Sequence, residues 1–289
     1  MKISNMIITI DMNSSDIQRK LVNNNREYFG NFLSEIAMNN FLIFTTNDSL
    51  KDIYNLIKKW NISRGTIIAC NGSIVYDIQS NNIILNKPIN MDSLKYLVHF
   101  STLTNALLQL KSINKTIIYS SDKWAKNDFK KFVSINEKTV SNYNNFIDYI
   151  GRKPFYSMEL YSPNDDVNFN IKLNDVLSFF KEKTINYQNI GENLHIFNEY
   201  KCSKSSALKF VLKKIYPNQI IKSDIYVAFN DIDQNIIKNL SNQNLINKIF
   251  ESNIEPNSNC FYIENDNGEK DSLPFLSFYL KVMKLLNME

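Results

Sequence analysis

The sequence predicts an α/β fold, in which a doubly wound parallel sheet is interrupted by an inserted α+β domain. Three short apolar runs within the first 70 residues alternate with two segments of helical spacing. The same alternation returns after about residue 192, and the segment between has a different texture. We therefore expect a core formed by residues 1–84 and 190–289, with the inserted domain over residues 85–189.

The first predicted strands are apolar runs of four or five residues followed by polar ones, which is typical of strands buried in a parallel sheet. Between them, apolar residues recur at helical spacing, and Trp60 closes one such stripe and is expected in the core. The predicted strands are Ile7–Ile10, Phe41–Phe44 and Thr66–Cys70, followed by a hairpin of Ile74–Tyr76 and Ile83–Leu85; the predicted helices cover 26–39 and Ser49–Trp60, capped by Asp48 or Ser49.

The inserted domain is predicted from a less regular mixture of periodicities. His99 lies on an apolar helix face and is expected in packing or at an interface rather than against a substrate. Arg152 and Lys153 are expected in a solvated turn, with contact to a substrate anion as the alternative. The predicted helices cover 92–110 and 171–182, and the predicted strands are Thr116–Tyr119 and Phe155–Tyr161.

The last third of the chain returns to the pattern of the first. His195 is expected to be a strand residue rather than a ligand. The predicted strands are Leu194–Phe197, Ile225–Phe229 and Cys260–Ile263, and the predicted helices cover Ser203–Ile215, with Ser203 as N-cap, and residues 233–240 and 272–287.

The composition excludes several classes of function. Among 289 residues, 33 are basic and 29 acidic, and a net charge of +4 gives no reason to expect a nucleic-acid or membrane-surface partner. No apolar run approaches the roughly 18 residues that span a bilayer. Three scattered cysteines provide neither a disulfide framework nor a zinc site and suit a reducing cytoplasm. Asparagine is abundant, and glycine occurs only six times.

Polar side chains follow the carboxyl ends of the predicted parallel strands, the edge at which such sheets bind ligands. Asp11 follows the first strand and Asp231 the strand at 225–229, and two carboxylates there suit a hard divalent cation such as Mg²⁺. Thr45 and Thr46 offer hydroxyls to a phosphate oxygen, and Lys204 adds a positive charge at a helix N-terminus. Together they favour phosphoryl transfer.

The order of these motifs resembles the haloacid dehalogenase superfamily, in particular its Cof-like sugar-phosphate phosphatases with an α/β cap. The resemblance spans nearly the whole chain and implies that the inserted domain is this cap. The family motifs Asp-x-Asp-Gly-Thr, Thr-Gly-Arg, Asn-Gly-Ala, Ser-Lys-Gly and Gly-Asp-x-x-Asn-Asp correspond here to Asp11–Ser15, Thr46–Asp48, Asn71–Ser73, Ser203–Ser205 and Asn230–Asn235.

The resemblance also implies a role for each position. Asp11 would attack phosphorus and form an aspartyl-phosphate, and position 13, here Asn13, would hold the acid/base group. Thr46 and Lys204 would bind phosphate, with the Asn71–Gly72 loop on the substrate side. The implied Mg²⁺ ligands are Asp11, the backbone carbonyl of Asn13, Asp231 and Asn235, with Asp233 as an open alternative to Asn235.

The departures from the family motifs are mostly asparagines. Asn13 and Asn235 replace Asp, while Asn47 and Asn230 replace Gly, as does Ser14. Because an amide cannot exchange a proton at neutral pH, an acid/base contribution of roughly 10²–10⁴-fold would be lost at position 13.

Two functions follow as expectations. The first is an Mg²⁺-dependent phosphatase of reduced activity that acts on a small phosphorylated, sugar phosphate-like metabolite. The alternative is a catalytically inactive protein of the same fold that binds a phosphorylated ligand or a protein partner in a regulatory role. A purely structural role is a third. Cap closure would be expected near residues 82–88 and 186–192, and the oligomeric state is left open.

Overall fold

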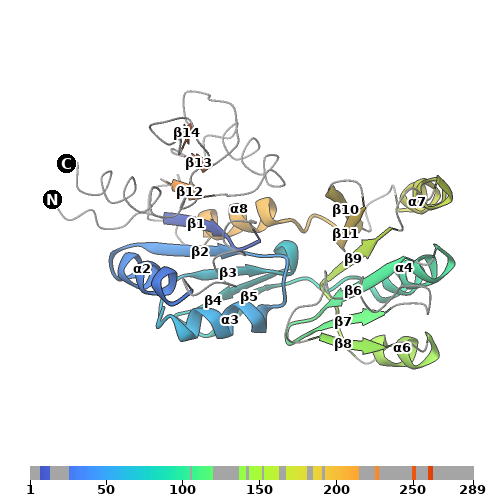
Figure 1. The fold of residues 1–289 in the computed structure, drawn as a ribbon, viewed down its shortest axis with the longest axis horizontal. Coiled ribbons are helices and arrows are strands. Elements are labelled where there is room, and N and C mark those ends of the chain that lie inside the picture. Colours follow the sequence, from blue (N-terminus) through green and yellow to red (C-terminus); the bar gives the residue numbers. More distant parts are fainter. Residues whose placement is uncertain are drawn as a thin grey trace.

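The structure is a computed structural model with two sheets and their helices (Figure 1). It describes residues 7–13, 26–104, 106–119, 137–140, 143–151, 153–162, 167–180, 185–190, 193–214, 225–227, 249–251 and 260–262. The predicted helices at 233–240 and 272–287 lie outside these residues, as do Arg152, Asp231, Asp233 and Asn235.

The first sheet has eight strands in the order β14-β13-β12-β1-β2-β3-β4-β5. Strands β14 to β3 are parallel, whereas β3, β4 and β5 pair in antiparallel fashion. The predicted doubly wound core is therefore confirmed. Its elements are β1 (Ile7–Asp11), α2 (Arg26–Asn39), β2 (Phe41–Thr45), α3 (Leu50–Lys59), β3 (Thr66–Ala69), the 3-10 turn η1 (Cys70–Gly72), β4 (Ile74–Asp77), β5 (Asn82–Asn86), α8 (Lys204–Lys214), β12 (Ile225–Val227), β13 (Ile249–Glu251) and β14 (Cys260–Tyr262).

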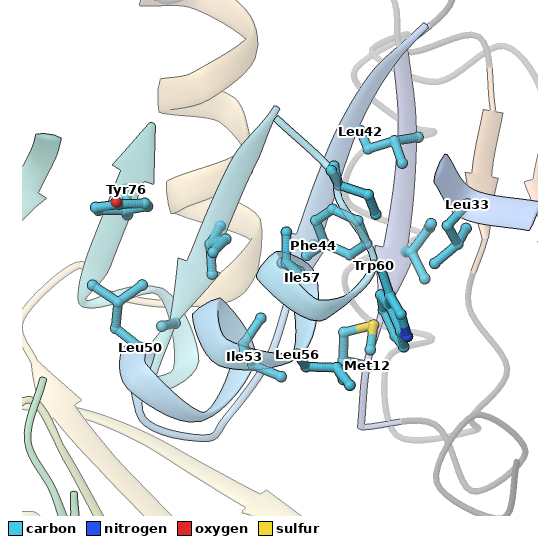
Figure 2. Close-up of a cluster of buried hydrophobic side chains, with 14 of the residues drawn as sticks. Met12, Leu33, Leu42, Phe44, Leu50, Ile53, Leu56, Ile57, Trp60 and Tyr76 are labelled. Carbon is cyan, nitrogen blue, oxygen red and sulfur yellow. The ribbon is translucent and has the colours of Figure 1, made fainter. Parts of the chain in front are cut away.

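Helix α3 packs its apolar face on the first sheet, as Figure 2 shows. Ile57 contributes to this buried cluster together with Phe44 of β2. Trp60, as predicted, is buried there, and Gly30 of α2 makes room for it. A Cβ atom at Gly30 would lie 2.0 Å from Cδ1 of the Trp60 indole. The helices thus hold the first three parallel strands, and with them their carboxyl ends, in one rigid layer.

The second sheet has six strands in the order β10-β11-β9-β6-β7-β8. Because side chains alternate across a strand, Leu108 and Leu110 of one strand pack with the helices in an apolar cluster. Gln109 and Lys111 of the same strand belong to the opposite face. The elements are α4 (Met91–Thr104), β6 (Leu107–Lys111), β7 (Thr116–Tyr119), β8 (Glu137–Val140), α6 (Tyr143–Ile150), β9 (Ser157–Tyr161), α7 (Val167–Phe179), β10 (Ile185–Ile190) and β11 (Leu194–Glu199).

The structure corrects the predicted helix over residues 92–110. Helix α4 ends at Thr104, and residues 107–111 form β6, which pairs with β7 and β9. The run Leu107–Leu110 is too short and too apolar for its periodicity to distinguish a buried helix from a buried strand. It forms a strand because it pairs with a neighbouring strand on each side. His99 in α4 is exposed, so of its two expected places, packing and an interface, the structure excludes packing in the core.

A second correction concerns the end of the inserted segment. Strand β11, predicted in the core, pairs with β9 and β10 of the second sheet. The chain passes between the sheets after β5 and again after β11, so the sheet boundary falls beyond Glu199 and not near residue 190. The segments 82–86 and 185–190, near which closure was expected, are strands β5 and β10.

Candidate functional site

The carboxyl ends of β1, β2 and β3 are joined to one another by backbone hydrogen bonds. The amide of Met12 donates to the carbonyl of Thr45 at 2.8 Å, and the amide of Thr46 donates to the carbonyl of Ile68 at 2.9 Å. One loop further, the amide of Asn71 donates to the carbonyl of Thr46 at 3.1 Å. The predicted convergence of polar strand ends is therefore present for these three strands.

Asp11 lies at the end of β1 and forms a buried ion pair with Lys204. The ammonium nitrogen of Lys204 is 2.9 Å from Oδ1 and 3.1 Å from Oδ2 of Asp11. The carboxylate is completely buried, and the lysine side chain is only 3% exposed. Two residues predicted for the site from distant parts of the chain thus meet.

The position of Lys204 is set by the first turn of α8. As predicted, Ser203 is the N-cap: its Oγ accepts a hydrogen bond from the amide of Ser206 at 3.1 Å, and Oγ of Ser206 accepts one from the amide of Ser203 at 2.9 Å. This turn lies directly against Gly72, where a Cβ atom would come within 2.1 Å of the Ser203 carbonyl oxygen. Gly72 also has a φ of +94°, so η1 and α8 approach closely only because this residue is glycine.

The amide of Asn13 connects the ion pair to the loop after β2. Its Oδ1 lies 3.4 Å from Nζ of Lys204 and accepts a short hydrogen bond from the backbone amide of Asn47. Its Nδ2 donates to Oδ2 of Asp48 at 3.5 Å. The side chain is thus oriented by a cation on its oxygen and a carboxylate on its nitrogen.

Thr46 is buried and exchanges hydrogen bonds with Asp48. Its Oγ1 accepts from the amide of Asp48 at 3.0 Å and donates to the Asp48 carboxylate at 3.3 Å. Thr45, the other predicted hydroxyl, is also buried, and its Oγ1 has no hydrogen-bond partner among the described residues. Thr46 therefore belongs to the same polar group as Asp11, Lys204 and Asn13.

Asn71, predicted on the substrate side, makes a buried contact with the second sheet. Its Nδ2 donates to Oδ1 of Asn198 at 2.9 Å, and φ at Asn71 is +53°. The Nδ2 group of Asn198 lies within 3.0 Å of three acceptors, the carbonyls of Cys70 and Tyr156 and Oγ of Ser73. Asn198 thereby joins the end of β11 to the loop that supports Lys204.

Sequence reasoning missed an ionic link between the two sheets. Nζ of Lys111, at the end of β6, lies 2.5 Å from Glu159 of β9 and 3.5 Å from Asp48 of the core loop. Burial alone would lower the pKa of Lys111, but the carboxylates of Glu159 and Asp48 outweigh burial and raise it. The one feature of the sequence that could have indicated this link is Glu159, a glutamate between apolar residues in the predicted strand Phe155–Tyr161.

Neither thiol near the site has the properties of a nucleophile. Burial raises the pKa of the Cys70 thiol to about 12, and burial also raises the pKa of Cys202. His195, as predicted, is a strand residue; it is buried, and its Nδ1 lies 2.9 Å from the hydroxyl of Tyr187. The polar group around Asp11 thus remains the candidate site.

The described half of the implied Mg²⁺ site is composed of oxygen donors. Asp11 and the backbone carbonyl of Asn13 lie at one strand end, and a carboxylate that accepts two hydrogen bonds from Lys204 retains lone pairs for a cation. This donor chemistry fits a hard divalent cation. Among the described residues, no group of three His, Cys, Asp or Glu side chains could by itself hold a metal, and Asp231 and Asn235 lie outside them.

Comparisons with known proteins place the chain in context. The haloacid dehalogenase-like hydrolase family matches residues 27–231. An uncharacterized protein of Mycoplasma genitalium is 24% identical over 283 residues, which cover 95% of this chain and 96% of that protein. In the part of the chain that the structure describes, no helix has the length and apolar character to cross a membrane.

Solved structures share the fold at low sequence identity. A haloacid dehalogenase-like hydrolase from Bacteroides thetaiotaomicron has a TM-score of 0.70 at 13% identity, over 96% of this chain and 100% of that one. A protein from Thermotoga maritima has a TM-score of 0.64 at 15% identity, over 95% and 97% of the two chains. A sugar phosphatase of subclass IIB has a TM-score of 0.63 at 10% identity, over 98% and 99%.

Proposed function

Because the chain belongs to the haloacid dehalogenase-like hydrolase family, we propose that it hydrolyses a phosphate monoester through Asp11. The observation that carries the proposal is the buried contact between Asp11 and Lys204, beside Thr46 and at the carboxyl edge of a parallel sheet. A carboxylate that can act as nucleophile thus lies beside a lysine and a hydroxyl that can bind phosphate, and phosphoryl transfer uses these groups together. A structural neighbour that is a sugar phosphatase supports a small sugar phosphate-like substrate.

In the proposed reaction, an oxygen of Asp11 attacks phosphorus and the bond from phosphorus to the ester oxygen breaks. Because Asn13 cannot donate a proton, the ester oxygen takes its proton from water. Lys204 binds the phosphate oxygens. To do so, its ammonium group turns away from the Asp11 carboxylate and toward the phosphate. Water then attacks phosphorus and gives up a proton to the solvent, and the bond from phosphorus to the Asp11 oxygen breaks to release inorganic phosphate. Mg²⁺, held by Asp11, the carbonyl of Asn13, Asp231 and Asn235, would neutralise charge on the phosphate when bound. The second sheet would act as the cap and restrict access of water.

The orientation of Asn13 supports reduced activity. The side-chain oxygen of Asn13 faces Lys204 and its nitrogen faces Asp48. Because an amide neither gains nor loses a proton at neutral pH, this side chain cannot exchange one with a leaving group. The same observation favours the second candidate, a protein that binds a phosphorylated ligand and releases it unchanged. The two candidates differ in turnover, while binding of a phosphate analogue with Mg²⁺ is common to both.

The experiment measures release of inorganic phosphate from p-nitrophenyl phosphate in the presence of Mg²⁺. We expect slow turnover in the wild-type chain that Asp11→Asn abolishes. The matched control is Asp92→Asn, which removes an exposed carboxylate in the first turn of α4. Equal rates in the wild type and in Asp11→Asn would exclude hydrolysis through Asp11. If vanadate with Mg²⁺ then raised the melting temperature of the wild type, the binding candidate would replace it.

A further inference from the structure

The charged side chains between the core site and the second sheet carry more negative than positive charge. Two ammonium groups face three carboxylates: Lys204 pairs with Asp11, and Lys111 lies between Glu159 and Asp48. Glu159 holds Lys111 at 2.5 Å, a full ångström closer than Asp48 does. Among these three carboxylates, Asp48 is therefore the one that lies farthest from its cation.

Exposure increases from Asp11 toward Asp48. The Asp11 carboxylate is completely buried and Thr46 is buried beside it, whereas the Asp48 side chain is 33% exposed. Asn13 lies between them and touches both Lys204 and Asp48. A phosphate at Asp11 would thus lie at depth, and the organic part of the substrate would extend past Asn13 toward Asp48.

The face of the second sheet beyond Asp48 is polar, and its side chains Gln109, Lys111 and Glu159 are buried. Gln109 pairs in register with Glu159, and Lys111 is on the same face two residues on from Gln109. Oε2 of Glu159 accepts a hydrogen bond from the hydroxyl of Tyr161 at 3.2 Å. The one ammonium group on this described face is already held by two carboxylates, so it offers no strong attraction to a second anion.

From these contacts we propose that Asp48 determines substrate specificity: the site takes monophosphates whose remainder is neutral or cationic and rejects those with a second anionic group. This inference rests on the proposed function for the position of the phosphate. Like charges at a partly exposed site repel one another across several ångströms. A hydroxyl or ammonium group at the same place can instead donate to the Asp48 carboxylate.

The test compares ligands that differ in charge and little else. Glucitol 6-phosphate and 6-phosphogluconate are both open chains, and the second adds a carboxylate. Glucose 6-phosphate and glucosamine 6-phosphate are both rings, and the second adds an ammonium group. Phosphate release gives kcat/KM in the presence of Mg²⁺, and calorimetry on the full chain carrying Asp11→Asn gives affinity whether or not hydrolysis occurs.

We expect the gluconate to be at least tenfold worse than glucitol 6-phosphate, and the amino sugar to equal or exceed glucose 6-phosphate. Asp48→Asn, which keeps the size of the side chain, should reduce the first gap at least threefold, whereas Asp92→Asn should leave it unchanged. The inference is overturned if the gluconate binds as well as glucitol 6-phosphate, if Asp48→Asn leaves the gap intact, or if none of the four binds. If the ligands bind but no phosphate is released, the proposed function is wrong. The calorimetric affinities then still test the role of Asp48.

Discussion

Lys204 holds both carboxylate oxygens of Asp11, at 2.9 and 3.1 Å, in a place that water does not reach. The attraction between two such charges offsets part of the cost of removing each from water. If one partner is removed, the other remains buried without compensation. If both are removed, this penalty disappears.

The first prediction concerns this ion pair. Lys204→Met should lower the free energy of unfolding by about 3–5 kcal/mol, because it leaves the Asp11 carboxylate buried and uncompensated. Adding Asp11→Asn to the same chain should recover a large part of that loss. Urea denaturation without metal, followed by circular dichroism, measures both. If the two substitutions simply add, the pair does not contribute in the way its geometry indicates.

The second prediction concerns the close approach of η1 to α8. Gly72→Ala should destabilise the chain by about 1–3 kcal/mol, because φ at this position is +94° and the new Cβ would clash with Ser203. It should also lower the rate of phosphate release, because the backbone of Lys204 must shift. Gly151→Ala is the control, since a Cβ there would lie 3.7 Å from its nearest neighbours. Equal melting temperatures for the two variants would contradict the prediction.

The sequence supported some of these relationships and was silent on others for physical reasons. Asp11, Thr46 and Lys204 follow or begin regular elements, so a strand-end argument and the order of motifs place them together. The contact of Asp48 with Lys111 depends on how two sheets are seated against each other, which no local pattern encodes. Strand β10 is too polar to show a strand period, and it forms because β11 offers it an edge.

The third prediction tests the junction of the two sheets. Asn198→Ala should cost about 2–3 kcal/mol of stability. It removes the buried partner of the Asn71 amide and of the Tyr156 carbonyl, and it leaves the Cys70 carbonyl with only the amide of Ser73. Asn189→Ala in the neighbouring strand β10 is the control, since Asn189 is exposed. Thermal unfolding of both variants provides the measurement. A loss of stability in Asn198→Ala no greater than in the control would show that this network adds nothing to the native state.

The last prediction concerns the position at which the family carries an acid/base aspartate. Asn13→Asp returns a titratable group beside Lys204, and the rate of phosphate release should rise. The gain should be limited to roughly tenfold, well below the usual 10²–10⁴, because the new carboxylate would face that of Asp48 at the place where Asn13 now donates a hydrogen bond.

An amide at position 48 removes that repulsion and supplies a donor. The double variant Asn13→Asp/Asp48→Asn should therefore exceed Asn13→Asp by a further factor of about ten with p-nitrophenyl phosphate as substrate. Asp48→Asn alone controls for the loss of the contact with Lys111. If neither chain that carries Asn13→Asp is faster than the wild type, proton transfer at position 13 does not limit this site, and the other replaced positions become the cause of its low activity.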